Sequence, residues 1–206
     1  LGSDINGESP GDEAGSALSL SADGLSVAVG AKLNDGAGTD VGHVRIFKVI
    51  TGTWVQQGSD IDGEAIGDRS GMSVSINSDG LTVAIGAPLN DATGTDVGHV
   101  RVYKFIAGSW VQLGADIDGE ASGDNSGNAV SISSDGTIIA IGAYANYATG
   151  SSGSNAGQVR VYKLITGAWV QLGLDLDGEG YNDLFGSAVS VSDDGLKVAI
   201  GAFFND

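Results

Sequence analysis

The sequence repeats itself, and this repeat constrains the fold more than any other feature of the chain. Trp54, Trp110 and Trp169 occupy equivalent places, 56 and 59 residues apart. A period of this length, built from short apolar runs, is typical of architectures in which each unit packs against its neighbours. We therefore interpret residues 1–206 as a single repeat domain, with units at about 1–56, 57–112, 113–171 and 172–206, the last incomplete.

The second unit shows the strands and turns that the sequence predicts for each repeat. Residues 71–87 form two alternating runs joined at Asp79-Gly80, a dipeptide that suits a tight primed hairpin turn. Two more strands are expected over residues 99–106 and 109–117, and no segment has helical periodicity. The predicted fold class is all-β, and units of four antiparallel strands fit the blades of a β-propeller. A solenoid is the rival architecture.

Alternation within the strands predicts how the units pack. Val83 and Ile85 point to one side of their strand, whereas Ala84 and Gly86 point to the other. The large face of one sheet is therefore expected on the small face of the next. The chain holds about 3.7 units of ~56 residues, and propellers have roughly four to eight blades. We expect a partial ring, a piece of a longer chain, or a ring completed by copies of itself.

Charge and composition exclude several classes of partner. The formal net charge of −17 repels the phosphates of nucleic acids and anionic lipids. No apolar run approaches the ~18 residues of a membrane span, so no membrane insertion is expected. The chain has no Cys and 35 Gly. Acidic repeats of this composition are common in secreted proteins, and we predict an extracellular or cell-surface location.

An acidic phrase recurs at the boundary between units. Its copies are DINGESPGD (4–12), DIDGEAIGD (60–68), DIDGEASGD (116–124) and DLDGEGYND (175–183). Closely spaced carboxylates supply the oxygen ligands that Ca²⁺ prefers, so calcium is the expected cofactor. The candidate metal ligands are Asp60, Asp62, Glu64, Asp68, Asp116, Asp118, Glu120, Asp124, Asp175, Asp177, Glu179 and Asp183. The alternative is a solvated turn whose Asp side chains accept hydrogen bonds from backbone amides.

A second acidic loop follows the second strand of each unit, at residues 34–40 and 90–96. Because successive strands alternate in direction, this loop and the acidic phrase are expected at the same end of the sheets. Together the two loop families hold 21 of the 26 Asp and Glu. The hairpin turns at the other end hold Asp23, Asp79, Asp135, Asp193 and Asp194.

Basic residues at the start of the third strand have structural interpretations. His43 and His99 occupy equivalent places, but Gln158 replaces them in the next unit, so no shared metal or base role is expected. Arg residues precede aromatic residues by two places, in the pairs Arg45–Phe47, Arg101–Tyr103 and Arg160–Tyr162. We expect the Arg stems to pack on the rings, the alternative being a ladder that binds glycans or acidic partners.

Short motifs of the repeat resemble those of a known family. Phe185-Gly186, Gly86-Ala87-Pro88 and the run from Gly98 to Tyr103 are similar to the motifs of the FG-GAP repeat, found in integrin-alpha-type β-propellers. The resemblance extends over essentially the whole chain and implies a propeller. Many members carry a D-x-D-x-D-G-x-x-D calcium loop between their first two strands. Here that hairpin closes on NSDG or SSDG, so the family's calcium residues have no counterpart.

These features predict a non-enzymatic extracellular repeat module for binding, adhesion or structural assembly. Its acidic loops would face a protein or glycan ligand, or copies of the chain itself, and no catalytic residue is expected. One alternative is a propeller-type polysaccharide lyase or hydrolase, and another is a purely structural surface or filament protein. An enzyme requires a loop that departs from the repeat, and residues 142–157 are the strongest departure, with no acid–base pair.

Overall fold

The computed structural model describes residues 2–147 and 155–205, and these residues form β-strands and turns without a helix. No segment of this part could therefore cross a membrane as a helix. Three sheets of five strands and one of two strands follow one another along the chain, and every pairing between strands is antiparallel. The predicted all-β antiparallel class is confirmed. Part of the divergent loop over 142–157 lies outside the described residues.

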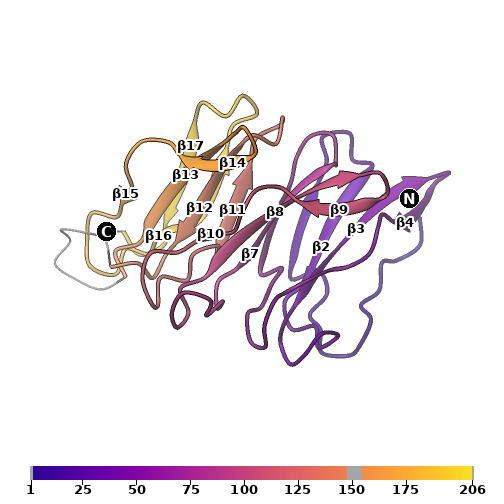
Figure 1. Cartoon of the computed structure of the whole chain (residues 1–206), viewed down its shortest axis with the longest axis horizontal. Coiled ribbons are helices and arrows are strands. Elements are labelled where there is room, and N and C mark those ends of the chain that lie inside the picture. Colours follow the sequence, from indigo (N-terminus) through magenta and orange to yellow (C-terminus); the bar gives the residue numbers. More distant parts are fainter. Residues whose placement is uncertain (1, 148–154, 206) are drawn as a thin grey trace.

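The three five-stranded sheets repeat the same strand order, and Figure 1 shows the sheets arranged one after another. The first sheet contains β1 (Ala17–Leu20), β2 (Ser26–Ala31), β3 (His43–Ile50), β4 (Thr53–Gln56) and β5 (Ile61–Asp62). The second contains β6 (Ser73–Ile76), β7 (Thr82–Ala87), β8 (His99–Ile106), β9 (Ser109–Gln112) and β10 (Ile117–Asp118). The third contains β11 (Ala129–Ile132), β12 (Ile138–Ala143), β13 (Gln158–Ile165), β14 (Ala168–Gln171) and β15 (Leu176–Asp177). The last contains β16 (Phe185–Val191) and β17 (Val198–Ala202).

The fourth strand differs from the prediction, because it is divided into two pieces. In the second sheet β9 pairs with the end of β8, and β10 pairs with its start, where Asp118 lies opposite His99. Gly114 separates the pieces with a φ of +83°. A Cβ there would lie 2.8 Å from the ring of Trp169, which belongs to the next sheet. The break therefore makes room for the Trp of the following unit.

The hairpin turn also differs from the prediction. In the second unit, residues 77–81 connect β6 to β7, and the Asn77 amide donates to the carbonyl of Thr82. Only Gly80 of the Asp79-Gly80 dipeptide has a positive φ, at +72°. A primed two-residue turn of type I′ needs a positive φ at both residues. The turn is thus a longer one with a single left-handed glycine.

The sheets stack in chain order, large face on small face as predicted. One core cluster joins Ala28, Val44 and Ile46 of the first sheet to Val83 and Ile85 of the second. On the small face the neighbouring backbone comes so close that a Cβ on Gly86 would overlap the carbonyl of Gly127. The equivalent crossings are Gly30 on Gly71 and Gly142 on Gly186.

Contacts between neighbouring sheets concentrate on their first strands. β1 contacts β6, β6 contacts β11, and β11 contacts β16. Serine hydroxyls on these strands accept amide hydrogens of the next sheet, in the pairs Ser19–Ile76 (3.0 Å), Ser75–Ile132 (3.1 Å) and Ser131–Val191 (2.9 Å). The two ends of the described chain lie at opposite ends of this row of sheets (Figure 1).

Candidate functional site

The two acidic loop families lie against each other at one end of the sheets, as predicted. The amides of Gly67 and Arg69, in and just after the phrase of residues 60–68, donate to the carbonyls of Thr39 and Asp40. The phrase of residues 116–124 contacts the loop of residues 90–96 in the same way. Each acidic phrase is therefore fixed on the preceding sheet, and the loops form one continuous surface.

The last carboxylate of each phrase has a structural role. Asp68 is 1% exposed, and its Oδ2 accepts the Ala65 amide at 3.0 Å and the Asn90 side chain at 2.8 Å. Asp183 accepts the Gly180 amide at 2.8 Å and the Asn205 side chain at 3.1 Å. Asp124 likewise accepts the amides of Glu120 and Ala121. Asp68 and Asp183 thus join their phrases to the residues that follow β7 and β17, whereas the hydrogen bonds of Asp124 lie within its own phrase.

The first and fifth places of the phrases meet a histidine instead. Ligand atoms of Glu64, His99 and Asp116 all lie within 4.8 Å of one another. The Nδ1 atom of His99 lies 3.8 Å from Oε2 of Glu64. Glu64 comes from one phrase and Asp116 from the next, and β8 places His99 between them. We call this group site 2.

Neighbouring side chains hold the carboxylates of site 2. Arg101 lies 3.4 Å from Oε1 of Glu64, and it also donates to the backbone carbonyl of Asp62 at 2.7 Å. Gln112 donates to Oδ1 of Asp116 at 2.6 Å. One oxygen of each carboxylate is thus occupied by a partner. The Oε2 atom of Glu64 is turned toward His99.

The first sheet repeats this arrangement in site 1, which consists of Glu8, His43 and Asp60. The Nδ1 atom of His43 lies 3.8 Å from Oε2 of Glu8 and 4.0 Å from Oδ2 of Asp60. Arg45 lies 3.7 Å from the other oxygen of Glu8, and Gln56 donates to Oδ1 of Asp60 at 2.6 Å. The two sites therefore have the same composition and similar distances, although both ring nitrogens are buried without a partner only at His99.

The third position of the repeat has Gln158 where the histidines stand. Its amide nitrogen donates to Oε2 of Glu120 at 3.1 Å and to Oδ1 of Asp177 at 3.4 Å. Asp175 accepts Gln171 at 2.7 Å, as Asp116 accepts Gln112. Two hydrogen bonds from the Gln158 amide nitrogen thus join carboxylates of the third position, whereas its Oε1 atom is buried without a partner among the described residues.

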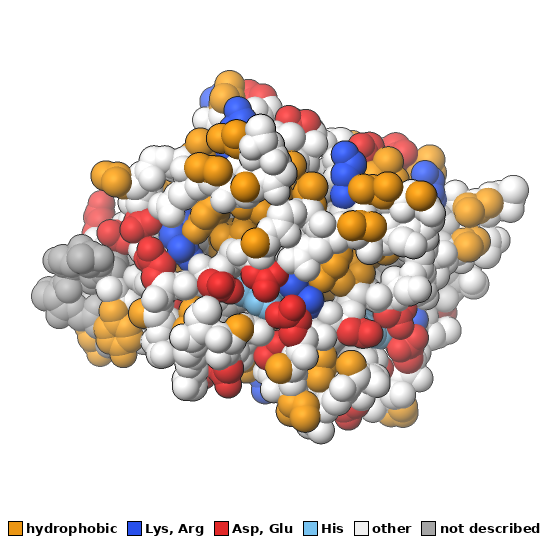
Figure 2. All heavy atoms as spheres, viewed as in Figure 1, with side chains coloured by type: hydrophobic (Ala, Val, Ile, Leu, Met, Phe, Trp, Pro, Cys, Tyr) orange, Lys and Arg blue, Asp and Glu red, His pale blue; other side chains and the backbone are white. Residues whose placement is uncertain are grey.

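The buried histidine of site 2 lies beside the exposed carboxylates of Glu64 and Asp116. His99 is 1% exposed, and neither ring nitrogen has a hydrogen-bond partner among the described residues. Burial, and next the guanidinium of Arg101, lower the pKa of His99 below its ordinary value of 6.5, so the ring is neutral at pH 7. The side chain of Glu64 is 41% exposed. Figure 2 shows acidic side chains gathered around the histidine atoms.

The third-strand arginines also pack as predicted. Their guanidinium carbons lie 5.4 to 5.6 Å from the ring centres of Phe47, Tyr103 and Tyr162. The tryptophans pack between sheets: Trp110 donates to the carbonyl of Gln57 at 2.7 Å. These contacts fix the outer part of each sheet to its neighbour, and Arg101 contributes to both the packing and site 2.

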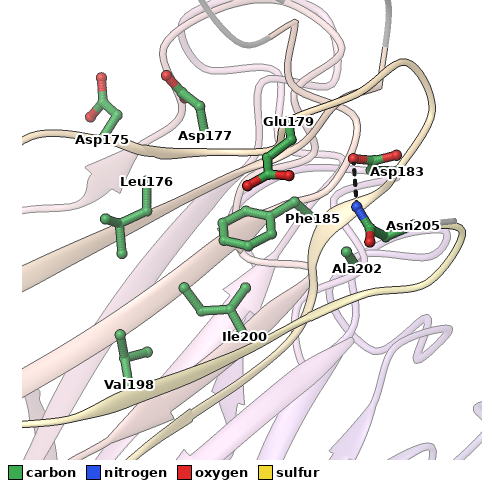
Figure 3. Close-up of a pocket in the computed structure, with 10 residues that line it drawn as sticks. All are labelled: Asp175, Leu176, Asp177, Glu179, Asp183, Phe185, Val198, Ile200, Ala202 and Asn205. Atoms are coloured by element: carbon green, nitrogen blue, oxygen red, sulfur yellow. Dashed lines mark hydrogen bonds between the residues drawn. The ribbon is translucent and has the colours of Figure 1, made fainter.

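The fourth copy of the phrase borders an open pocket of about 830 Å³ (Figure 3). It is lined by Asp175, Leu176, Asp177, Glu179, Asp183, Phe185, Val198, Ile200, Ala202 and Asn205. Leu176 is 39% exposed, whereas the equivalent Ile61 and Ile117 are 5% exposed in core clusters shared with the following sheet. No histidine lines this pocket among the described residues.

The sequence pattern identified the acidic residues but not how they combine. No group of three ligand residues found within the described chain comes from a single phrase. Sites 1 and 2 include Asp60, Glu64 and Asp116 from the candidate set, and they add Glu8 and the two histidines. The sequence does contain a signal for these sites, because histidine occurs at the same place in two consecutive units. Because Gln158 stands at this place in the third unit, the repeat pattern alone does not predict a shared metal role.

No protein-family model and no curated protein sequence matches the chain. Its fold is similar to that of a solved structure from Bacteroides uniformis described as a "putative 6-phosphogluconolactonase", with a TM-score of 0.57 and 12% sequence identity. The similarity covers 89% of this chain and 46% of that one, so this chain spans less than half the length of the protein that it matches. At this identity the likeness concerns the fold alone.

The prediction that the chain is not an enzyme is contradicted by this likeness, because the solved protein is described as an enzyme. A regular repeat does not mark a non-enzymatic module, because one fold supports many activities and the repeat reports only on the fold. The lactonase description applies to the solved protein.

Proposed function

We propose that the chain is part of an FG-GAP-like β-propeller that acts outside the cell as a binding module, and that divalent cations at sites 1 and 2 complete its binding surface. The single observation that carries this proposal is the group of Glu, His and Asp that recurs in two consecutive units. Three protein ligands leave a coordination position open, which a carboxylate or hydroxyl oxygen of a protein or glycan ligand can occupy.

Packing supports the propeller part of the proposal. The first strand of each later sheet packs against the first and second strands of the sheet before it, an arrangement compatible with blades around a central axis. The small faces at Gly30, Gly86 and Gly142 let each sheet come close to the next. Site 2 joins Glu64, which follows β5 of the first sheet, to His99 and Asp116 of the second, so the stacking that builds the array also assembles this site.

The cation requirement is tested by thermal unfolding and calorimetric titration of chain freed of metal with a chelator. Ca²⁺, Mn²⁺ and Zn²⁺ are added separately. We expect at least one of them to bind and to raise the unfolding midpoint, because an ion that binds only the folded state stabilises it. If none of the three binds at millimolar concentration, the proposed function is wrong.

Ligand bridging is tested on a surface of carboxymethyl dextran. A chain with a net charge of −17 is repelled by this polyanion unless a bound cation joins the two. We expect retention with the cation and release by chelator, and light scattering of the same samples shows whether copies bind one another instead. Equal retention with and without chelator would contradict a cation-bridged surface.

A further inference from the structure

We infer that sites 1 and 2 select a transition-metal ion of the zinc class over calcium, and that the residue at the start of the third strand decides which copy of the repeat binds it. This inference rests on the proposed function and specifies its cation. The donor set at each site is one imidazole nitrogen and two carboxylate oxygens. Calcium takes oxygen ligands, whereas imidazole suits zinc and its neighbours.

The buried histidine of site 2 is the strongest evidence for a nitrogen ligand. Both ring nitrogens of His99 are buried without a partner, and Nδ1 is directed at Glu64 and Asp116. Buried polar atoms in proteins almost always have a partner, and one left without costs stability. A metal ion bound to Nδ1 and to the two carboxylates satisfies this atom.

The geometry fits a small ion. Two ligand atoms of a tetrahedral zinc site lie ~3.4 Å apart, since each is about 2.1 Å from the metal. His99 Nδ1 and Glu64 Oε2 are 3.8 Å apart, and rotation of the half-exposed Glu64 side chain closes the difference. Arg101 and Gln112 hold the other oxygens of the two carboxylates. Such supporting contacts orient metal ligands in known sites.

The third copy provides a natural comparison. Gln158 replaces the histidine while Glu120, Arg160 and Asp175 are kept, with Arg160 3.8 Å from Glu120. The Gln158 amide donates to Glu120 and so occupies the oxygen that would face a metal. An amide nitrogen has no lone pair for coordination, and the amide oxygen of Gln158, which is buried without a partner among the described residues, is a ligand of the kind that calcium prefers. The repeat therefore contains two sites of the zinc class, and the third position lacks one.

The test is equilibrium dialysis of the whole chain against Zn²⁺ or Ca²⁺, with the bound metal measured by mass spectrometry. The wild-type chain should hold two tightly bound Zn²⁺ and bind Zn²⁺ at least about tenfold more tightly than Ca²⁺. His99→Gln and His43→Gln should each lose one Zn²⁺, and the double variant should lose both. Gln158→His should gain a third. Gln is tolerated at the equivalent place in the third sheet, so the variants should keep the unfolding cooperativity of the wild type in chelator.

Each outcome decides a different claim. If Ca²⁺ binds as tightly as Zn²⁺, or if the double variant keeps both Zn²⁺, the inference is overturned while the proposed function survives. If no cation binds, both fail. Loss of one Zn²⁺ per histidine together with a gain in Gln158→His supports the inference, because exposed carboxylates elsewhere on the chain are unchanged in these variants.

Discussion

In the metal-free protein the two buried ring nitrogens of His99 have no partner, so this residue is a cost to the fold. His99→Gln introduces the side chain that Gln158 shows to be acceptable, with an amide that can donate to Glu64. Gln158 pairs its amide nitrogen but leaves Oε1 buried without a partner, so the variant should have one unpartnered buried atom in place of two. We expect its free energy of unfolding in chelator to exceed that of wild type by about 1 kcal/mol at most, measured by urea denaturation. With Zn²⁺ present the order should reverse.

The contrast between the two conditions is the control for this prediction. A variant that is less stable than wild type in chelator would mean that the His99 ring packs better than an amide can. A residue that destabilises the free protein and stabilises the metal complex is typical of a functional site. This reversal would distinguish a ligand from a residue of the core.

The sequence predicts which acidic residues can bind a metal, but it does not predict which of them meet in space. Within one acidic phrase Asp60 and Glu64 are close in sequence. This spacing predicts that a single phrase binds one ion. In the structure Glu64 meets Asp116, which lies 52 residues further along the chain. That distance is closed by the stacking of two sheets, and nothing in the spacing of one phrase encodes it.

At the scale of strands and turns, glycines set how closely the sheets approach. We expect Gly86→Ala to lower the free energy of unfolding by about 1–3 kcal/mol, because its Cβ would overlap the Gly127 carbonyl, which a side-chain rotation cannot move. Urea denaturation measures this change. Alanine suits a strand better than glycine by itself, so a loss cannot come from strand propensity.

The matched control is Gly108→Ala, in the turn between β8 and β9. Nothing lies within 4 Å of a Cβ built there, and its φ of +92° makes the substitution costly only through local strain. That cost is ~1 kcal/mol. If Gly86→Ala cost no more than this control, close approach of the sheets would not limit the residue at position 86.

Strand positions were more predictable than strand breaks. The expected third strand over residues 99–106 is β8, because alternating aliphatic residues continue through it without a glycine. The expected fourth strand over 109–117 ends early at Gln112. The reason is Trp169 of the next sheet, which packs over Gly114. A pattern within one strand does not show a side chain that arrives from another unit.

For the whole molecule, the repeat predicted both the class of fold and the way sheets stack. Each sheet exposes a large and a small face, so burial requires a neighbour on either side. The same regularity says nothing about chemistry, which explains why the non-enzymatic prediction failed against the solved lactonase-like fold. Function in such an array depends on the few positions where copies differ, such as His99 and Gln158.

The net charge of −17 makes the whole molecule sensitive to salt. Raising the ionic strength from 0.01 M to 0.1 M shortens the screening length from ~30 Å to ~10 Å, which weakens repulsion among the loop carboxylates. We therefore expect the free energy of unfolding in chelator to rise with NaCl over this range. Asp35→Asn with Asp91→Asn keeps the side-chain oxygens that accept the Asp40 and Asp96 amides while removing two charges.

This double variant should be more stable than wild type at low salt and should depend less on NaCl. Zn²⁺ should have a similar effect, since two bound ions remove four units of negative charge at the same end of the sheets. A free energy of unfolding that falls with NaCl would contradict the argument. It would mean that attractive pairs such as Lys32–Glu13, at 3.1 Å, and Arg101–Glu64 outweigh the repulsion.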